Sequence, residues 1–342
     1  MPQYNIQLPA PLTQWGGEEE FRSTLQREGG WVVRALAHSP WVTVELPGRA
    51  GDAGARVRSC PGVLSIELDS SCSNCQPTST VAVRAGSSPV TWAAAMVGAP
   101  EAHRVTRGGG ARVVVIDTGL APHGDMEGAS IGTVASLVPH EGPEDQHGHG
   151  TAITGLIVAQ GQHLQGIAPA AHVMMLRALG RDGEGMWSWV AAAVDRAIDL
   201  QADVVVMALG GDDESAMLED ALASLALSGA GAVAPAGNGG AGRLDFPART
   251  GIPLVATAVD REGQRASWSN WGPWPASPDV SAPGVDVPVL AHTGGYSVMS
   301  GTSIACGITG ACWSLVYAAF PGLRSALAHS VAPDPKEGGE MA

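Results

Sequence analysis

The chain of 342 residues is long enough for one large domain and a small one, and an apolar fraction of 45% is sufficient for a sizeable core. A net charge of −14 excludes proteins that present a basic face to nucleic acid, and the sequence has no Lys/Arg cluster for an anionic membrane. We therefore expect neither nucleic acid nor a membrane as a partner.

The first 75 residues have the pattern of a separate small unit. Strand-like runs cover residues 4–8, 31–37, 41–46 and 63–69, with a charged helix at 18–27 and a weaker helical stretch towards Cys60. This strand–helix–strand–strand–helix–strand order predicts a small α+β ferredoxin-like domain. Residues 76–90 belong to a stretch rich in Ser, Thr and Pro, which is typical of a connector.

A buried parallel strand is predicted at residues 113–116, where four β-branched residues stand in a row. Asp117 follows at the carboxyl end of that strand, and Gly119 supplies a turn. In open α/β sheets, ligands and catalytic groups gather at this edge. Asp117 is therefore a candidate site residue.

Two further candidates stand at the beginning of predicted helices. His149, in Gly148-His149-Gly150-Thr151, precedes an apolar run at 152–159. Ser303 follows Gly301 and Thr302 and precedes the apolar stretch 304–320, which we expect to be a core helix although its length would also suit a membrane span. A serine at a helix N-terminus has free N–H groups beside it that can stabilise an oxyanion.

Together these residues suit nucleophilic catalysis. His149 can accept the proton of Ser303 near neutral pH, and Asp117 can fix the tautomer of His149 and stabilise its charged form. His147 competes for the role of base, but it lacks the Gly-Thr pair that follows His149.

On these motifs, the chain resembles the subtilisin-like serine proteases, the subtilases. The matching segments are Ile116-Asp117-Thr118-Gly119, Gly148-His149-Gly150-Thr151, Ala236-Gly237-Asn238 and Gly301-Thr302-Ser303, and the resemblance covers residues 92–331. It implies an α/β fold with a parallel sheet flanked by helices over residues 91–331, and a flexible tail at 332–342. It also implies a serine endopeptidase that works through an acyl-enzyme.

The resemblance assigns further roles. Asn238 would donate a side-chain N–H to the oxyanion, and Ala208, Leu209, Gly210 and Gly237 would bind the substrate. Asp245 matches a position at the base of the main specificity pocket, where a carboxylate would favour a basic residue before the cut bond. The alternative is that Asp245 points into solvent.

Subtilases commonly carry an N-terminal propeptide that assists folding and inhibits the enzyme, and residues 1–75 match that place. The alternative is an unrelated α+β adaptor domain. Self-cleavage in the connector would release the propeptide, and the bond after Arg84 is one candidate. We thus expect a peptide or protein substrate, and the propeptide itself as an intramolecular partner.

No cofactor or metal is expected from the motifs. Calcium is common in the family, and Asp125 matches a frequent ligand, but residues 160–165 lack the pattern that would complete the site. Cys72 and Cys75 could be a redox pair, half of a metal site or a local disulfide, and we favour no metal. Cys306 and Cys312 are expected to be small buried residues, too far apart on one helix for a disulfide.

The N-terminal 20 residues lack the basic start and apolar run of a secretory signal, which predicts a protein that begins in the cytoplasm or leaves by another route. Beside the nucleophile, Cys306 and Gly307 replace residues that the family usually has. Two rival functions remain: a pseudoprotease that only binds peptides, and a peptide ligase on the same fold.

Overall fold

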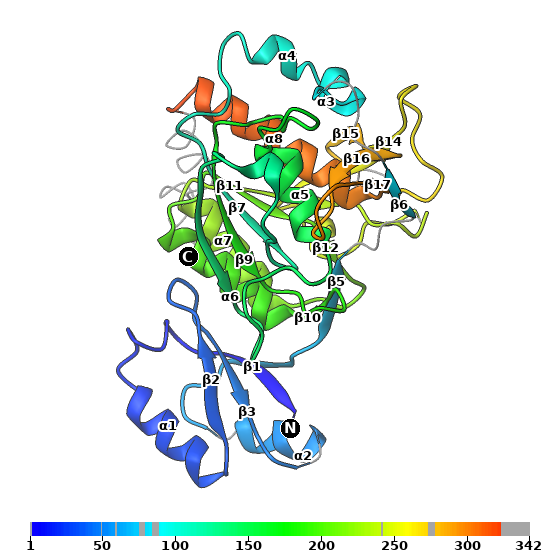
Figure 1. Cartoon of the computed structure of the whole chain (residues 1–342). Coiled ribbons are helices and arrows are strands. Elements are labelled where there is room, and N and C mark those ends of the chain that lie inside the picture. Colours follow the sequence, from blue (N-terminus) through cyan, green and yellow to red (C-terminus); the bar gives the residue numbers. More distant parts are fainter. Residues whose placement is uncertain are drawn as a thin grey trace, which may run out of the picture.

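The computed structural model describes residues 2–48, 50–58, 60–74, 79–83, 89–240, 242–272 and 278–322, with only the backbone of residues 50, 51 and 79–83. The expected tail at 332–342, Arg84 and Cys75 lie outside the described residues. Figure 1 shows a small N-terminal unit (blue) below a larger domain that holds a central sheet.

The N-terminal unit is an antiparallel sheet of four strands with two helices on one face. Its elements are β1 (Gln3–Gln7), α1 (Glu18–Arg27), β2 (Trp31–Ala35), β3 (Trp41–Glu45), α2 (Ala50–Arg58) and β4 (Ser65–Leu68). The strand order β2-β3-β1-β4 is that of a ferredoxin-like unit. Because side chains alternate along a strand, Ile6, Val42 and Val44 point together and pack with Phe21 of α1. Each predicted element is present, with ends that differ by at most two residues.

A seven-stranded parallel sheet forms the centre of the larger domain, in the order β15-β14-β13-β11-β7-β9-β8. Its strands are β7 (Arg112–Asp117), β8 (Ile131–Ser136), β9 (His172–Arg177), β11 (Val204–Met207), β13 (Gly231–Pro235), β14 (Leu254–Val259) and β15 (Val280–Pro283). Its large helices are α5 (His149–Val158), α6 (Trp187–Asp199), α7 (Ala216–Leu227) and α8 (Thr302–Ala319). The α/β fold with a parallel sheet flanked by helices is as predicted.

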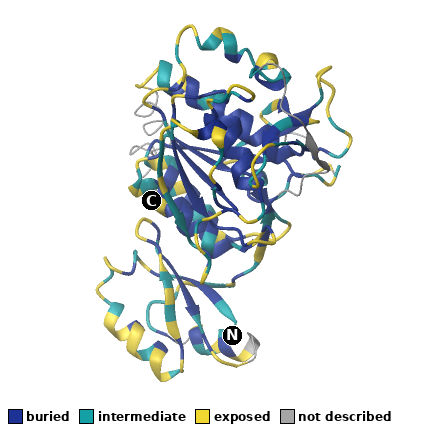
Figure 2. Ribbon diagram, viewed as in Figure 1, coloured by how far each residue is buried: buried dark blue, intermediate teal, exposed yellow. Residues whose placement is uncertain are grey.

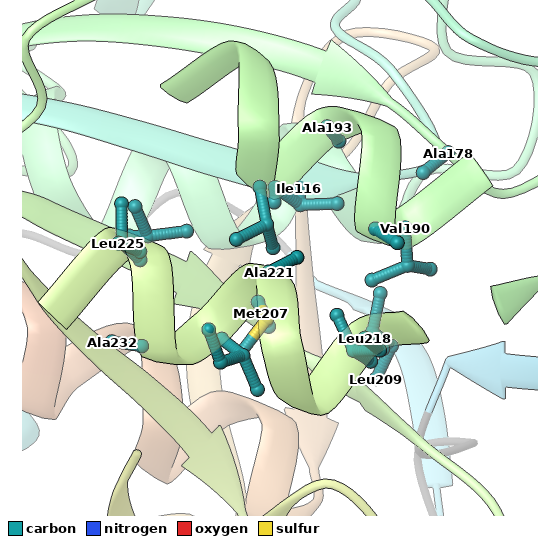
Figure 3. Packing of buried hydrophobic residues seen from close by; sticks show 14 of the residues in the cluster. Ile116, Ala178, Val190, Ala193, Met207, Leu209, Leu218, Ala221, Leu225 and Ala232 are labelled. Carbon is teal, nitrogen blue, oxygen red and sulfur yellow. The ribbon is translucent and has the colours of Figure 1, made fainter. Parts of the chain in front are cut away.

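The alternation of side chains along β7 explains how both faces of the sheet are covered. Val113 and Val115 pack in the cluster that includes α5 and α8, whereas Val114 and Ile116 pack in the cluster that includes α6 and α7. Figure 3 shows the second cluster, with Ile116 among alanine, valine and leucine side chains of the two helices. A strand buried on both faces must be apolar throughout, which is why four β-branched residues occur in a row.

Helix α8 is long and apolar enough to cross a membrane by length and composition alone. It packs instead against β11, β13, β14 and β15, and most of it is buried inside the protein. Figure 2 shows it in dark blue at the centre of the larger domain. The core-helix interpretation of this stretch is therefore correct.

Two small sheets flank the carboxyl edge of the central sheet. The first has β5 (Ser71–Asn74) between β10 (Glu184–Met186) and β12 (Leu209–Gly210), and the second has the order β16 (Val287–Leu290), β17 (Tyr296–Ser300) and β6 (Ser79–Val83). The short remaining elements are α3 (Trp92–Met96), α4 (Ala99–Ala102), η1 (Gly124–Met126) and η2 (Ala248–Thr250). Strand β6 lies within the stretch that the sequence indicates only as a connector.

The N-terminal unit packs on α6 and α7 through the other face of its sheet. Trp41 is 1% exposed, and its indole N–H donates to Asp220 at 2.7 Å. The carboxylate of Glu67 accepts hydrogen bonds from Ser215 and from backbone N–H groups at the start of α7. The carboxylate of Asp69 accepts hydrogen bonds from the N–H and the hydroxyl of Ser188 at the start of α6. Carboxylates at helix N-termini are favoured by the free N–H groups and by the helix dipole, so this contact is both polar and specific.

Candidate active site

Asp117 and His149 form a buried, hydrogen-bonded pair. Asp117 is the last residue of β7 and His149 the first residue of α5, and both are 0% exposed. Nδ1 of His149 lies 2.8 and 2.9 Å from the two carboxylate oxygens of Asp117. Gly148 caps α5 with a positive φ of 103°, a backbone conformation that glycine adopts without strain. The turn and the strand end therefore bring together two residues that are 32 positions apart.

Charge around His149 favours its protonated form. Burial by itself would lower the pKa of His149, but the charge and hydrogen bond of Asp117 and the charge of Asp145 raise it above the usual value. His147 differs, because burial and the neighbouring His149 lower its pKa. Since His149 has the carboxylate partner, it is the histidine of this pair that suits a base.

Ser303 lies at the beginning of α8, directly after Gly301 and Thr302, and is 0% exposed. Within the described part of the chain, neither its Oγ nor Nε2 of His149 has a hydrogen-bond partner. A buried polar atom without a partner needs an explanation, and a role in proton transfer would give one. The helix start and the Asp117–His149 pair thus contribute the two atoms that a nucleophile–base pair needs.

Thr302, the residue before Ser303, fixes the side chain of Asn238 through two hydrogen bonds. Asn238 follows β13, and its Oδ1 accepts hydrogen bonds from the backbone N–H of Thr302 at 2.9 Å and from the Thr302 hydroxyl at 2.8 Å. These two donors fix which end of the amide is the acceptor, so that the NH₂ end is the donor. Asn238 also lines a cavity together with Asp245.

The predicted substrate-binding segment pairs with a strand of the same chain. Leu209 and Gly210 form β12, which pairs antiparallel with Asn74 and Ser73 of β5, and Ala208 precedes it in the core. On its other side, β5 pairs with β10, and the N–H of Asn74 donates to the carbonyl of Gly183. Residues 184–186 form a strand because β5 gives them a pairing partner. Residues 71–74 fill a position that an extended peptide could occupy.

Asp245 lines a cavity of about 410 Å³ whose wall also includes Gly210, Asp212, Asn238 and Arg243. Asn270 donates to its carboxylate at 2.9 Å. A methyl group on Gly237 would clash with the same carboxylate, so the backbone passes very close to it. Burial and the charge of Asp212 raise the pKa of Asp245 to about 6. The carboxyl group therefore lies at the cavity wall and not in open solvent.

The sequence comparisons decide the family. The signature of the subtilase family (Peptidase_S8) matches residues 108–331, which is more than half of the chain.

The chain belongs to the subtilase family.

The alkaline protease of Shouchella clausii is 36% identical over 245 residues, which are 70% of this chain and 62% of that protein. Subtilisin BL of Lederbergia lenta is 37% identical over 220 residues, which are 63% of this chain and 80% of that protein. The chain thus spans about six-tenths of the length of the Shouchella relative.

The calcium site that the family suggests does not fit the residues around Asp125. Its Oδ2 accepts hydrogen bonds from the hydroxyl of Tyr296 at 2.9 Å and from the N–H of Leu164 at 3.0 Å. In the described ranges, no group of three or more His, Cys, Asp or Glu residues could hold a metal ion. A hard cation needs six to eight oxygen ligands, so Asp125 is held by hydrogen bonds here and we derive no role for calcium.

The cysteines follow the expectation only in part. Cys306 is 0% exposed behind Ser303, with its thiol near the carbonyl of Met207 at 3.7 Å. Cys312 is only partly buried, contrary to expectation, although it packs against the same core cluster. Cys72 is buried in β5, and its relation to Cys75 lies outside the described residues.

Sequence reasoning missed one buried carboxylate near the pair. Asp145 is 5% exposed and accepts hydrogen bonds from residues on both sides of the Asp117–His149 contact. An aspartate four residues before a histidine that begins a helix is a signal of such a role, because carboxylates cap free N–H groups there.

Proposed function

We propose that this chain is a serine endopeptidase that hydrolyses peptide bonds through an acyl-enzyme. The observation that carries the proposal is the buried Asp117–His149 hydrogen bond, together with Ser303 at the start of α8, a helix that packs against α5, in a chain of the subtilase family. Asp117, His149 and Ser303 would be the triad, and Asn238 would bind the oxyanion.

The chemistry follows from the positions of these groups. The Oγ of Ser303 attacks the peptide carbonyl and Nε2 of His149 takes its proton, while Asp117 holds Nδ1–H and stabilises the imidazolium. The amide of Asn238 donates to the oxyanion, and removing one such donor costs about 3–4 kcal/mol of transition-state stabilisation. His149 then gives the proton to the leaving amine, and water hydrolyses the acyl-enzyme with His149 again as base.

Covalent labelling tests this proposal. A fluorophosphonate should label the wild type and Ser303→Ala should not react, whereas Ser267→Ala, an exposed loop serine, should label as the wild type does. A folded wild-type protein that takes no label and cuts no peptide would favour the pseudoprotease. Transfer of the acyl group to an added amine at the expense of hydrolysis would favour the ligase.

We further propose a preference for a basic residue before the cut bond. Asp245 lines the cavity beside Asn238, and its carboxylate would pair with a lysine or arginine side chain that enters. A peptide library read out by mass spectrometry tests this. Cleavage mainly after apolar residues would overturn it.

We also propose that residues 1–75 are a propeptide that inhibits the site and is removed by self-cleavage. The support is that β5 lies between β10 and β12, where it competes with an extended substrate, and that Glu67 and Asp69 hold the unit on α6 and α7. The strand β5 would then both block the substrate position and lead into the connector where the propeptide is cut off.

Two places for the self-cleavage compete. The bond after Arg84 suits the basic preference, but it lies outside the described residues. Residues 75–78 lie outside the described residues as well, and the support for a cut among them comes from the strands on either side: Asn74 pairs with Leu209, and Ser79 pairs with Ser300, three residues before Ser303. N-terminal sequencing of the processed wild type decides between them, with Ser303→Ala as the form that should stay intact. Processing that persists in Ser303→Ala would argue against self-cleavage.

A further inference from the structure

Asp145 is a buried carboxylate that the proposed reaction does not use. Its Oδ1 accepts hydrogen bonds from the hydroxyl of Thr118 at 2.9 Å and from the N–H groups of His147 and Gly148 at 3.0 and 2.7 Å. Its Oδ2 accepts from the N–H and the hydroxyl of Thr151, at 2.9 and 2.6 Å. Five donors therefore converge on one side chain.

These donors come from the two elements that carry the pair. Thr118 follows Asp117 at the end of β7, whereas Gly148 and Thr151 stand on either side of His149 at the start of α5. The hydroxyl of Thr118 also accepts from the N–H of Gly150 at 2.9 Å. Asp145 therefore ties the strand end to the helix start, with one hydrogen bond from Thr118 on the strand side and four from the turn and first residues of α5.

The site requires a charged acceptor. All five groups that bond to Asp145 are donors, and an ionised carboxylate only accepts, whereas an amide in its place would point its own N–H groups at other donors. Burial alone would raise the pKa of Asp145, but the hydrogen bonds from Gly148, Thr151 and Thr118 lower it below the usual value. Asp145 is thus a fixed negative charge close to the histidine.

We infer that Asp145 is a positioning residue for the catalytic pair: it holds Asp117 and His149 in register, and its charge stabilises the imidazolium that forms during the reaction. The inference rests on the proposed function. The titratable groups that face His149 are Asp117 from β7 and Asp145 and His147 from the turn before α5, and His292 borders Gly148 and acts on His147. Of these, Asp117 and Asp145 are the carboxylates.

A cap that only stabilises α5 would behave differently. Its loss would lower the free energy of unfolding, but it would leave the pH profile of the folded enzyme unchanged. A positioning charge also acts on His149. Without that charge the imidazolium is less stable, so the acidic limb of kcat/KM moves to lower pH.

The experiment compares Asp145→Asn, Asp145→Glu and Asp279→Asn. Each variant is expressed as the full chain, allowed to process, and checked for folding by circular dichroism. Asp279 accepts one N–H, from Val255 at the opposite edge of the sheet, and serves as the control. We expect Asp145→Asn to lower kcat by about 10–100-fold with little change in KM, because misplacement of a catalytic group by 1 Å can have that effect. Its acidic limb should move to lower pH.

Asp145→Glu keeps the charge and changes the geometry, so it should lower kcat while the acidic limb stays in place. A folded Asp145→Asn with wild-type kcat, or with lower stability but an unchanged limb, would overturn the inference. If Asp145→Asn does not fold, Thr118→Val removes one donor to Asp145 and the link to Gly150; wild-type kcat in that variant would also overturn it. Failure of the proposed function is distinct, since the wild type itself would then be inactive.

Discussion

The two carboxylate oxygens of Asp117 lie 2.8 and 2.9 Å from Nδ1 of His149, in a place where neither side chain is exposed. This contact sets the tautomer of His149 and leaves Nε2 as the atom that can receive a proton. Ser303 and Asn238 can act in the proposed reaction only when His149 is held in this way.

Replacing Asp117 by asparagine should therefore abolish most of the activity. An amide can hold the opposite tautomer of His149, and the comparable change in a serine protease triad lowers kcat by about 10⁴-fold. We expect kcat of Asp117→Asn to fall by about that factor, with the fold kept. The control is Asp203→Asn, since Asp203 accepts the N–H of Arg112 at the other end of the same strand. Equal losses in both variants would contradict a specific role of Asp117.

The preference for basic residues should depend on pH through Asp245. Burial and the charge of Asp212 raise its pKa to about 6, so the carboxyl becomes neutral as the pH falls through that value. The ratio of kcat/KM for an arginine substrate over a leucine substrate should then decrease below pH 6. In Asp245→Asn the ratio should be about 10–100-fold lower at pH 8, as expected for a lost charged hydrogen bond.

The exposed neighbour Asp213 offers a matched control, since Asp213→Asn removes one charge without touching the cavity wall. It should keep the wild-type ratio. A ratio that stays constant between pH 5 and 8 in the wild type would contradict the role of Asp245.

The N-terminal unit should loosen when Glu67 loses its charge. Its carboxylate accepts from Ser215 at 2.8 Å and from the N–H of Ala216 at 2.9 Å, at the start of α7. Glu67→Gln should weaken the contact by about 1–2 kcal/mol, a factor of 5–30 in equilibrium. Hydrogen–deuterium exchange at residues 215–218, in the Ser303→Ala background, should become faster by that factor. Glu20→Gln on the exposed face of α1 should leave it unchanged.

Tyr296 should stabilise the protein without calcium. Its hydroxyl donates to the buried Asp125, and burial together with that carboxylate raises the pKa of Tyr296 to about 12. Tyr296→Phe should lower the free energy of unfolding by about 1.5–3 kcal/mol, measured by urea titration. Tyr317→Phe removes a bond to a neutral carbonyl and should cost about 1 kcal/mol. EDTA should leave the unfolding midpoint unchanged, and a large loss of stability with EDTA would show that a cation binds.

Much of the fold could be predicted because it is coded locally. Four β-branched residues before Asp117 can only form a strand that is covered on both faces, and Gly301 with a long apolar run predicts a core helix. The predicted ends of the strands and helices were less accurate than their predicted type. Residues 184–186 form a strand only because β5 pairs with them, and pairing partners distant in sequence leave no local pattern.

The positions of the candidate site residues in the fold could be predicted for a similar reason. Asp117, His149 and Ser303 follow strands or begin helices, so their places at the carboxyl edge are implied by the order of elements. Asp145 was missed, because the sequence shows one carboxylate in a polar turn and not the five donors that surround it.

By itself, the sequence determined the fold class, the motif residues and the family, since each depends on periodicity and short motifs. The tertiary structure alone decided which partners those residues meet. Tyr296 bonds to Asp125, 171 positions away in the sequence, and Glu67 bonds to the start of α7, 149 positions away. Hydrogen bonds act over about 3 Å, whereas sequence separation says nothing about which buried groups reach that distance.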